Sequence, residues 1–169
     1  MNVLKAAALA VAVAWAIPSQ AQEWQTSSAL VNPSKYGADF KHYDYVNPDA
    51  PRTGTINRAV IGTFNSFNPF IIRGAAAAGL GQTGGMLYDT LMAQSPDEPG
   101  VAHPLIAEAL KYPADYSSVT YRLNAKAKWH DGQPITAEDV VWSFEKLKAL
   151  SPLYVRYYAN VTGAKALND

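Results

Sequence analysis

The sequence predicts an α/β fold, and three segments support this prediction. Residues 117–124 alternate apolar and polar side chains, which is the pattern of a half-buried strand. Residues 54–61 carry alternating β-branched and polar side chains and predict another strand. In residues 137–150 the apolar side chains recur at helical spacing. The chain, with 169 residues, is long enough for one domain.

Residues 1–21 are expected to be an export signal. Lys5 provides the positive start, and residues 6–17 form an apolar stretch that is too short to span a bilayer. Ser19 and Ala21 are small residues at the usual cleavage positions, so cleavage is expected before Gln22. The alternative is a retained membrane anchor, although no second long apolar stretch follows. The expected location of residues 22–169 is therefore the periplasm.

Composition excludes several kinds of function. The chain contains no cysteine, so a lipobox, disulfides and thiolate chemistry are excluded. Its 14 basic and 14 acidic residues balance, which argues against a nucleic-acid partner. His42, His103 and His130 are far apart and lack ligand spacing, so no metal is expected. We also expect no cofactor and a monomeric state.

The first half of the mature sequence is rich in aromatic residues and turns. Residues 35–51 carry aromatic side chains that predict a packed arm rather than a ligand cage, namely Tyr36, Phe40, Tyr43 and Tyr45. The strand expected at residues 54–61 would end at Asn68-Pro69, because the residue before proline avoids the helical region. Residues 79–84 fit a dinucleotide-type glycine pattern by letter only, and the alanines before them favour helix.

Further short elements are expected before the second strand. Residues 86–92 resemble an early helix of the family named below, and in that helix Leu87 and Leu91 would be buried four residues apart. Residues 95–100 are a loop rich in proline and acidic residues, and residues 104–110 predict a short helical turn. In the strand at residues 117–124, the side chains expected to point inward are Val119, Tyr121 and Leu123.

The most informative stretch is residues 127–141. Asp131-Gly132 predicts a tight turn, and Pro134 favours extended backbone after it. Thr136 is a candidate N-cap, and Asp139, three residues later, completes a capping box. The helix then continues with Val140, Val141, Phe144 and Leu147 on one face and is ended by Ser151-Pro152. An acid–base role for the carboxylates here is the alternative to turn and cap chemistry, and it concerns Asp131, Glu138 and Asp139.

Residues 127–141 resemble the hallmark of the family 5 extracellular solute-binding proteins, which are the peptide and oligopeptide receptors of ABC importers. Residues 40–51 resemble the entry segment of the branch associated with uptake of peptides and microcin C. The resemblance implies a hinged, two-lobe, periplasmic binding protein-like fold of the peptide-receptor class. It covers only the N-terminal part of such proteins, so we expect an N-terminal fragment or truncated product that cannot bind peptide alone. The alternative is a complete small domain.

The same resemblance implies the site residues. In peptide-binding relatives the loop equivalent to Arg73, Gly74 and Ala75 lines the cleft, although many carry an acidic residue where this chain has Arg73. In these relatives a tyrosine in this part of the chain also touches the bound peptide. Tyr157 is the closest match to it, and Tyr154 is the second candidate. The alternatives are a surface arginine and tyrosines that serve only packing.

The implied function is the capture of a peptide or peptide-like solute and its delivery to an inner-membrane ABC permease. No catalytic residues are expected, because no nucleophile lies beside a base in sequence. The alternatives are a periplasmic hydrolase and a non-functional remnant of a truncated gene.

Overall fold

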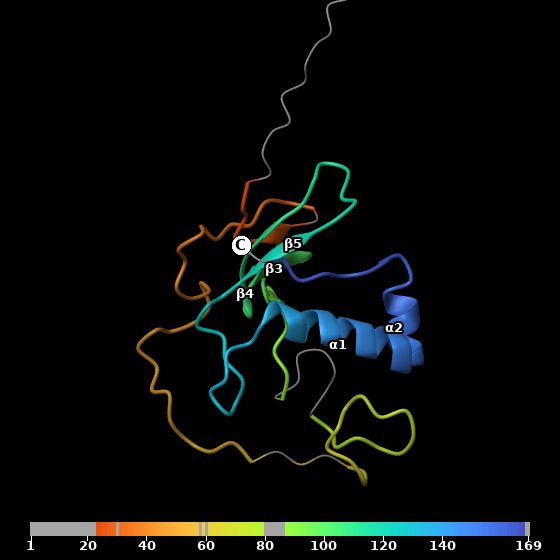
Figure 1. The fold of residues 1–169 in the computed structure, drawn as a ribbon. Coiled ribbons are helices and arrows are strands. Elements are labelled where there is room, and N and C mark those ends of the chain that lie inside the picture. Colours follow the sequence, from red (N-terminus) through yellow and green to blue (C-terminus); the bar gives the residue numbers. More distant parts are fainter. Residues whose placement is uncertain (1–22, 30, 58, 60, 80–86, 168–169) are drawn as a thin grey trace, which may run out of the picture.

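The computed structural model of the chain describes residues 23–29, 31–57, 59, 61–79 and 87–167, so the expected export signal lies outside the described part. Both strands and helices are present, as the α/β prediction requires. The strands and helices concentrate in the second half of the chain, and a long irregular segment precedes them (Figure 1). None of the described helices combines the length and the apolar character needed to cross a membrane.

The strands form two small antiparallel sheets. The first has the order β1-β3-β2 and consists of β1 (Ser28–Ala29), β3 (Val101–Pro104) and β2 (Met92–Gln94). The second pairs β4 (Ala107–Lys111) with β5 (Thr120–Leu123), and its register shifts between Ala107 and Ala109. Gln25 bridges to Leu110, so the segment before β1 ties the first sheet to the second.

The core lies on β3 and β4. Its buried side chains on these two strands are small or medium in size, and Ala107 has no exposed surface. Small side chains let β3 and β4 approach closely, since protein interiors are packed without voids. The buried apolar residues among those described are Val101, Ala102, Ala107, Ala109, Leu110 and Tyr154.

The helix expected at residues 137–150 is confirmed as α1 (Ala137–Leu150). The Thr136 hydroxyl accepts from the Asp139 N–H at 3.2 Å, while the Asp139 carboxylate accepts from the Thr136 N–H at 2.9 Å. The preceding turn is also confirmed: Gly132 has φ +89°, and Asp131 Oδ1 accepts from the Gln133 N–H at 2.9 Å. These reciprocal bonds satisfy backbone groups that a helix start leaves unpaired.

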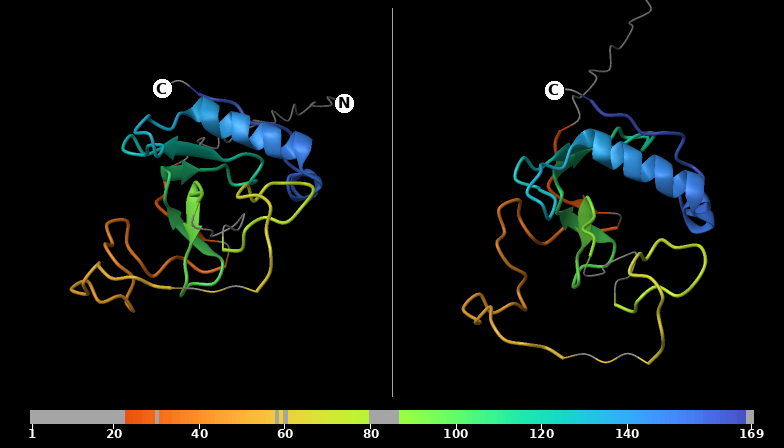
Figure 2. Two further views of the ribbon diagram at one scale, coloured as in Figure 1. Left: turned by 90° about the horizontal axis from the view of Figure 1, so that it is seen from below. Right: turned by 60° about the horizontal axis from the view of Figure 1, so that its bottom comes forward.

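The helix also ends where the sequence predicts. Ser151 has extended backbone angles at the C-cap of α1, and Pro152 begins the short helix α2 (Pro152–Tyr157). Proline suits the first position of a helix because its missing N–H would have no partner there. Seen from below, α1 extends beside the strands and leads to α2 at its far end (Figure 2). The resulting corner carries the tyrosines predicted to contact ligand.

The prediction of a helical turn at residues 104–110 is wrong. Residues 101–104 and 107–111 are strands, and the corner between them donates hydrogen bonds to an earlier segment. Leu105 and Ala107 donate to the Leu91 carbonyl at 3.1 and 3.0 Å. Alanine and leucine favour helix locally, but pairing with distant backbone overrides this weak preference.

Two other predicted elements are absent from the described residues. Residues 54–57, 59 and 61 are irregular, so the strand expected at 54–61 is wrong, and Ile56 and Ile61 are exposed. Residues 87–91 are not helical, Leu87 is exposed, and Met92 already belongs to β2. A strand needs a neighbour for its backbone hydrogen bonds, and residues 54–61 find none among the described segments.

The second expected strand is confirmed only in its C-terminal half, as β5. Its inward-facing assignment is wrong for Val119, which is exposed, whereas Tyr121 is partly covered, with 36% of its surface exposed, and Leu123 is half-buried. The sheet of β4 and β5 has two strands, and its buried apolar side chains come from β4. The glycine pattern at residues 79–84 falls mostly outside the described residues.

Candidate ligand-binding site

The segment that carries Arg73, Gly74 and Ala75 is a loop closed on itself. The Asn65 N–H donates to the Ala75 carbonyl at 3.0 Å, and the Ala77 N–H donates to the Ser66 carbonyl at 2.9 Å. The Asn65 side chain adds a bond, because its Oδ1 accepts from the Ala75 N–H at 3.1 Å. These contacts define the 65–77 loop, whose two ends are held together by backbone pairing.

Gly74 occupies a backbone conformation that requires glycine. Its φ is +97°, and a Cβ at this position would lie 2.6 Å from Asn65 Oδ1. The absence of a side chain therefore allows both the turn and the Asn65 bond. Arg73 and Ala75 are exposed, and Arg73 has no ion-pair partner among the described residues. The loop thus presents a free guanidinium next to accessible backbone.

The tyrosines of α2 differ strongly in exposure. Tyr154 is buried, with 9% of its surface exposed, and stacks on Tyr158 with ring centroids 5.8 Å apart. Tyr157 is 75% exposed and contacts Tyr158 edge-on at 5.0 Å. Tyr154 therefore serves packing in this structure, and Tyr157 is the tyrosine of the pair that is available to a ligand.

The structure brings the 65–77 loop and α2 together. The ring of Phe70 lies 6.2 Å from that of Tyr154 and 5.2 Å from that of Tyr88. The yellow-green loop accordingly lies near α2 in every view (Figures 1 and 2). Two segments that are far apart in the sequence, both predicted to contact ligand, thus lie on one side of the molecule.

The hydroxyls of Tyr154, Tyr158 and Tyr121 remain protonated at neutral pH. Burial raises the pKa of Tyr154, and the nearby Tyr157 raises it further. Burial is also the main cause of the raised pKa of Tyr158 and of Tyr121. A protonated phenol can donate to a carbonyl or carboxylate and can also accept, which suits a peptide-like ligand.

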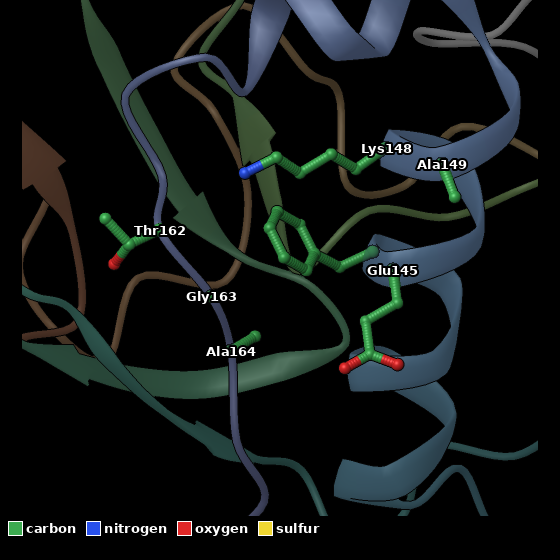
Figure 3. Close-up of a pocket in the computed structure, with 7 residues that line it drawn as sticks. Glu145, Lys148, Ala149, Thr162, Gly163 and Ala164 are labelled. Atoms are coloured by element: carbon green, nitrogen blue, oxygen red, sulfur yellow. The ribbon is translucent and has the colours of Figure 1, made fainter.

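A surface depression lies elsewhere, between the C-terminal end of α1 and residues 162–164. Figure 3 shows Lys148 extending from α1 across it toward this C-terminal segment. The Lys148 ammonium donates to the Val161 carbonyl. None of the predicted ligand-binding residues lines this depression, so it is separate from the candidate site.

Sequence reasoning missed a buried polar cluster centred on Glu98. Its carboxylate accepts from the Lys35 N–H at 2.7 Å and from the Ser34 hydroxyl at 3.0 Å, and its Oε2 lies 3.0 Å from His103 Nε2. The Ser95 hydroxyl completes the set at 3.1 Å. The available signal was the spacing of Glu98 and His103, an acidic residue five positions before a histidine in an apolar stretch. Its partners Ser34 and Lys35 come from a distant segment and leave no such signal.

The aromatic arm of residues 35–51 packs on this cluster, as predicted. Phe40 lies 4.7 Å from the His103 ring, and Tyr36 and Tyr43 each lie 5.9 Å from it. Burial raises the pKa of Glu98, but the hydrogen bonds from Lys35, His103 and the two serines outweigh this and lower it overall. The serine hydroxyls donate to Glu98 rather than to the imidazole, so the cluster is a structural clamp rather than a nucleophile–base pair.

Metal binding has no visible basis in the part of the chain that the structure describes. No group of three histidine, cysteine, aspartate or glutamate side chains is arranged there to hold an ion. Two of the three carboxylates considered for acid–base chemistry, Asp131 and Asp139, make structural bonds. Asp131 holds the turn, and Asp139 caps α1 and accepts from the Trp129 indole at 3.3 Å. Hydrogen bonds from Thr136 are the main cause of the lowered pKa of Asp139.

Comparisons with known proteins agree with the resemblance in the sequence. Residues 101–169 match the family described as bacterial extracellular solute-binding proteins, family 5 Middle. The matched segment contains the turn and the capped helix at residues 127–150.

Several curated relatives cover most of the chain. An uncharacterized protein, y4wM, of Sinorhizobium fredii is 46% identical over 154 residues, which is 89% of this chain and 23% of the relative. The probable peptide-binding protein YejA of Agrobacterium fabrum is 42% identical over 146 residues, or 86% of this chain and 23% of the relative. The peptidoglycan-binding protein YepA of the same organism is 41% identical over 115 residues, covering 66% and 19% respectively.

The chain thus spans about a quarter of the length of the first two relatives. By these matches, the family inferred from residues 127–141 is confirmed: the chain carries part of the sequence of the family 5 bacterial extracellular solute-binding proteins.

Proposed function

We propose that this chain forms part of a periplasmic receptor that binds peptides or peptide-like solutes and delivers them to an inner-membrane ABC permease. The observation that carries the proposal is the 42% identity to a probable peptide-binding protein over 146 residues. A relative named for peptidoglycan binding supports the wider class of peptide-like solutes. We further propose that the receptor acts as a monomer, binds rather than catalyses, and has the two-lobe fold of periplasmic binding proteins.

The proposed ligand contacts lie on the 65–77 loop and on α2. Gly74 and Ala75 are exposed, so a peptide main chain can approach the backbone of the loop on its solvent side. Arg73 is exposed and free of ion pairs among the described residues, and its planar guanidinium can bind a carboxylate through two parallel bonds. Tyr157 offers an exposed ring and a hydroxyl at the same side of the molecule. Phe70 and Tyr154 support this arrangement from beneath.

A chimera with a longer relative provides the test. Residues 23–167 would replace the matching residues of the YejA relative from Agrobacterium fabrum, and peptide affinity would be measured by calorimetry with a defined set of tripeptides to pentapeptides. We expect the chimera to bind within about tenfold of the parent, that is, within about 1.4 kcal/mol. A chimera that melts cooperatively but binds no peptide would refute the proposal.

Single variants in the chimera separate the contacts. Arg73→Ala should weaken binding of anionic peptides by roughly 1.5–3 kcal/mol, the scale of a hydrogen bond to a charged group, and Arg73→Lys should restore only part of that loss. The affinity of Tyr157→Phe measures the contribution of the hydroxyl, and the further loss in Tyr157→Ala measures the contribution of the ring. Arg156→Ala, on the same helix, is the matched control for charge. Equal affinities in Arg73→Ala and the parent chimera would remove Arg73 from the site.

Export is tested separately. N-terminal sequencing of the chain from a periplasmic extract should give a start at Gln22. A soluble cytoplasmic product that still begins with Met1 would contradict the proposed location.

A further inference from the structure

A second pocket lies within the turn-rich end of the aromatic arm, away from the 65–77 loop and α2. Its volume is about 390 Å³, toward the lower end of the range for small-molecule sites. It belongs to the orange segment, which lies on the opposite side of the molecule from α2 (Figures 1 and 2). Its lining residues are Lys41, His42, Val46, Asn47, Pro48, Ala50, Pro51 and Arg52.

The charged side chains that line the pocket are all basic. Two cations, Lys41 and Arg52, line it together with an imidazole, and no acidic side chain does. Neither cation has an ion-pair partner among the described residues. Three aspartates lie in the same stretch of sequence without lining the pocket, namely Asp39, Asp44 and Asp49, and Asp44 is held by Lys35 at 3.0 Å. The side chains that line the pocket therefore carry positive charge without a lining carboxylate to offset it.

The walls of the pocket are apolar and partly fixed. Val46 and three small or cyclic residues contribute apolar surface beside the cations. The backbone is held by turns, since the Val46 N–H donates to the Tyr43 carbonyl at 3.0 Å and the Ala50 N–H donates to the Asn47 carbonyl at 3.2 Å. Tyr43 stacks on Tyr45 at 5.6 Å and also belongs to the aromatic group around His103. The pocket is therefore anchored to the core through the arm.

We propose that this pocket binds a compact phosphate monoester that carries an apolar group. The guanidinium of Arg52 matches phosphate geometry through its planar pair of donors, and the Lys41 ammonium adds a point charge. The apolar wall receives the organic part of the ligand. This site is independent of the proposed peptide site, because it shares no residue with it.

The test uses the full chain and three probes: phenyl phosphate, inorganic phosphate and phenol. Phenyl phosphate should bind with a Kd of about 1 mM or tighter, which corresponds to about 4.1 kcal/mol, and should bind more tightly than inorganic phosphate. Phenol should not bind detectably. Raising the salt concentration should weaken the binding, because the site is open to solvent. A ligand concentration of about 10 mM is about tenfold above the expected Kd, which corresponds to about 1.4 kcal/mol. If no phosphate binding is detected at that concentration, the proposal is overturned.

Variants locate the binding. Arg52→Ala should weaken phenyl phosphate binding at least tenfold and Lys41→Ala by a smaller factor, while the exposed position of both residues leaves Tm unchanged. Lys126→Ala removes the same charge at an exposed turn elsewhere and should leave the Kd unchanged. Equal losses in Lys126→Ala and Lys41→Ala would show that only net charge matters and would also overturn the proposal.

Vesicles distinguish the source of the phosphate. Co-sedimentation with phosphatidylglycerol vesicles but not with phosphatidylcholine vesicles, lost in Arg52→Ala, would assign the site to lipid headgroups. Binding of phenyl phosphate without co-sedimentation would assign it to soluble phosphate esters. Co-sedimentation that persists in Arg52→Ala would instead place the lipid contact outside this pocket and contradict the headgroup assignment.

Discussion

Residues 101–150 and residues 52–79 contain similar kinds of side chains but differ in how they find partners. In the first region each strand pairs with another segment, and α1 begins with a complete capping box. In the second region Ile56 is 81% exposed, and the described backbone forms no strand longer than a bridge. Regular structure therefore forms where local signals and distant partners coincide, and apolar content alone does not produce it.

The second region also contains three of the candidate ligand contacts, Arg73, Gly74 and Ala75. Large apolar side chains remain exposed there, and two of them, Phe64 and Phe67, lie with their ring centroids 4.9 Å apart. The exposed members are Ile56, Ile61, Phe64, Phe67 and Ile72. This exposure supports the proposal that the region acts within a larger receptor.

The largest expected difference between the regions concerns burial of a charge. Ala107→Asp places a carboxylate at a position without exposed surface, so the free energy of unfolding should fall by at least about 3 kcal/mol. Ala78→Asp makes the same change at an exposed position of the second region and should alter it by less than about 0.5 kcal/mol. Chemical denaturation followed by circular dichroism measures both. Similar losses in the two variants would contradict the comparison.

A smaller effect is expected at the polar clamp. Glu98→Gln keeps the shape but removes the charge that accepts four hydrogen bonds, so Tm at pH 7 should fall, though by less than in Ala107→Asp. Because the pKa of folded Glu98 lies below its usual value of 4.5, its stabilisation is complete above about that pH and is lost as the pH falls through the folded-state pKa.

Thermal melts of both proteins between pH 7 and pH 3 provide the check. The gap in Tm between the natural chain and Glu98→Gln should close as the pH falls below about 4.5. A gap that stays constant over this range would show that the charge of Glu98 does not contribute to the clamp.

The capping box of α1 should have a more modest effect. Thr136→Ala removes the hydroxyl that accepts from the Asp139 N–H, and loss of an N-cap costs about 1 kcal/mol of stability. Thr136→Ser retains the hydroxyl and should recover most of the loss. The comparison is a urea titration of the three proteins. A Thr136→Ser variant as unstable as Thr136→Ala would point to the methyl group rather than the cap.

The smallest effect on overall stability is expected at the 65–77 loop. Gly74→Ala strains a positive φ and brings a Cβ to 2.6 Å from Asn65 Oδ1, so the loop should open more easily, by about 1 kcal/mol or more locally. Hydrogen exchange at the Ala75 N–H should accelerate, while global unfolding changes by less than about 0.5 kcal/mol. Gly62→Ala, where nothing lies within 4 Å, is the matched control and should not affect Ala75.

The sequence predicted the locally encoded parts of the fold. Thr136, Asp139 and Pro152 act within a few residues of their own position, so the bounds of α1 could be derived without knowledge of the rest of the chain. The tight turn at Gly132 belongs to the same class, because its positive φ is a local property.

The parts that depend on distant partners could not be predicted. Residues 104–110 contain good helix formers, but the carbonyls of Thr90 and Leu91 bind their backbone and draw them into the sheet corner. The clamp at Glu98 depends on Ser34 and Lys35, more than 60 positions away. For the site, the resemblance pointed to the 65–77 loop and α2, but only the Phe70–Tyr154 contact places them on one side.

Hydrogen exchange of the YejA chimera, with and without a bound peptide, tests the central functional claim most directly. The account predicts that peptide slows exchange in the 65–77 loop and in α2, while β3 and β4, already protected in the core, change little. Peptide-dependent protection that is confined to other segments, with the 65–77 loop and α2 unchanged under saturating peptide, would contradict it.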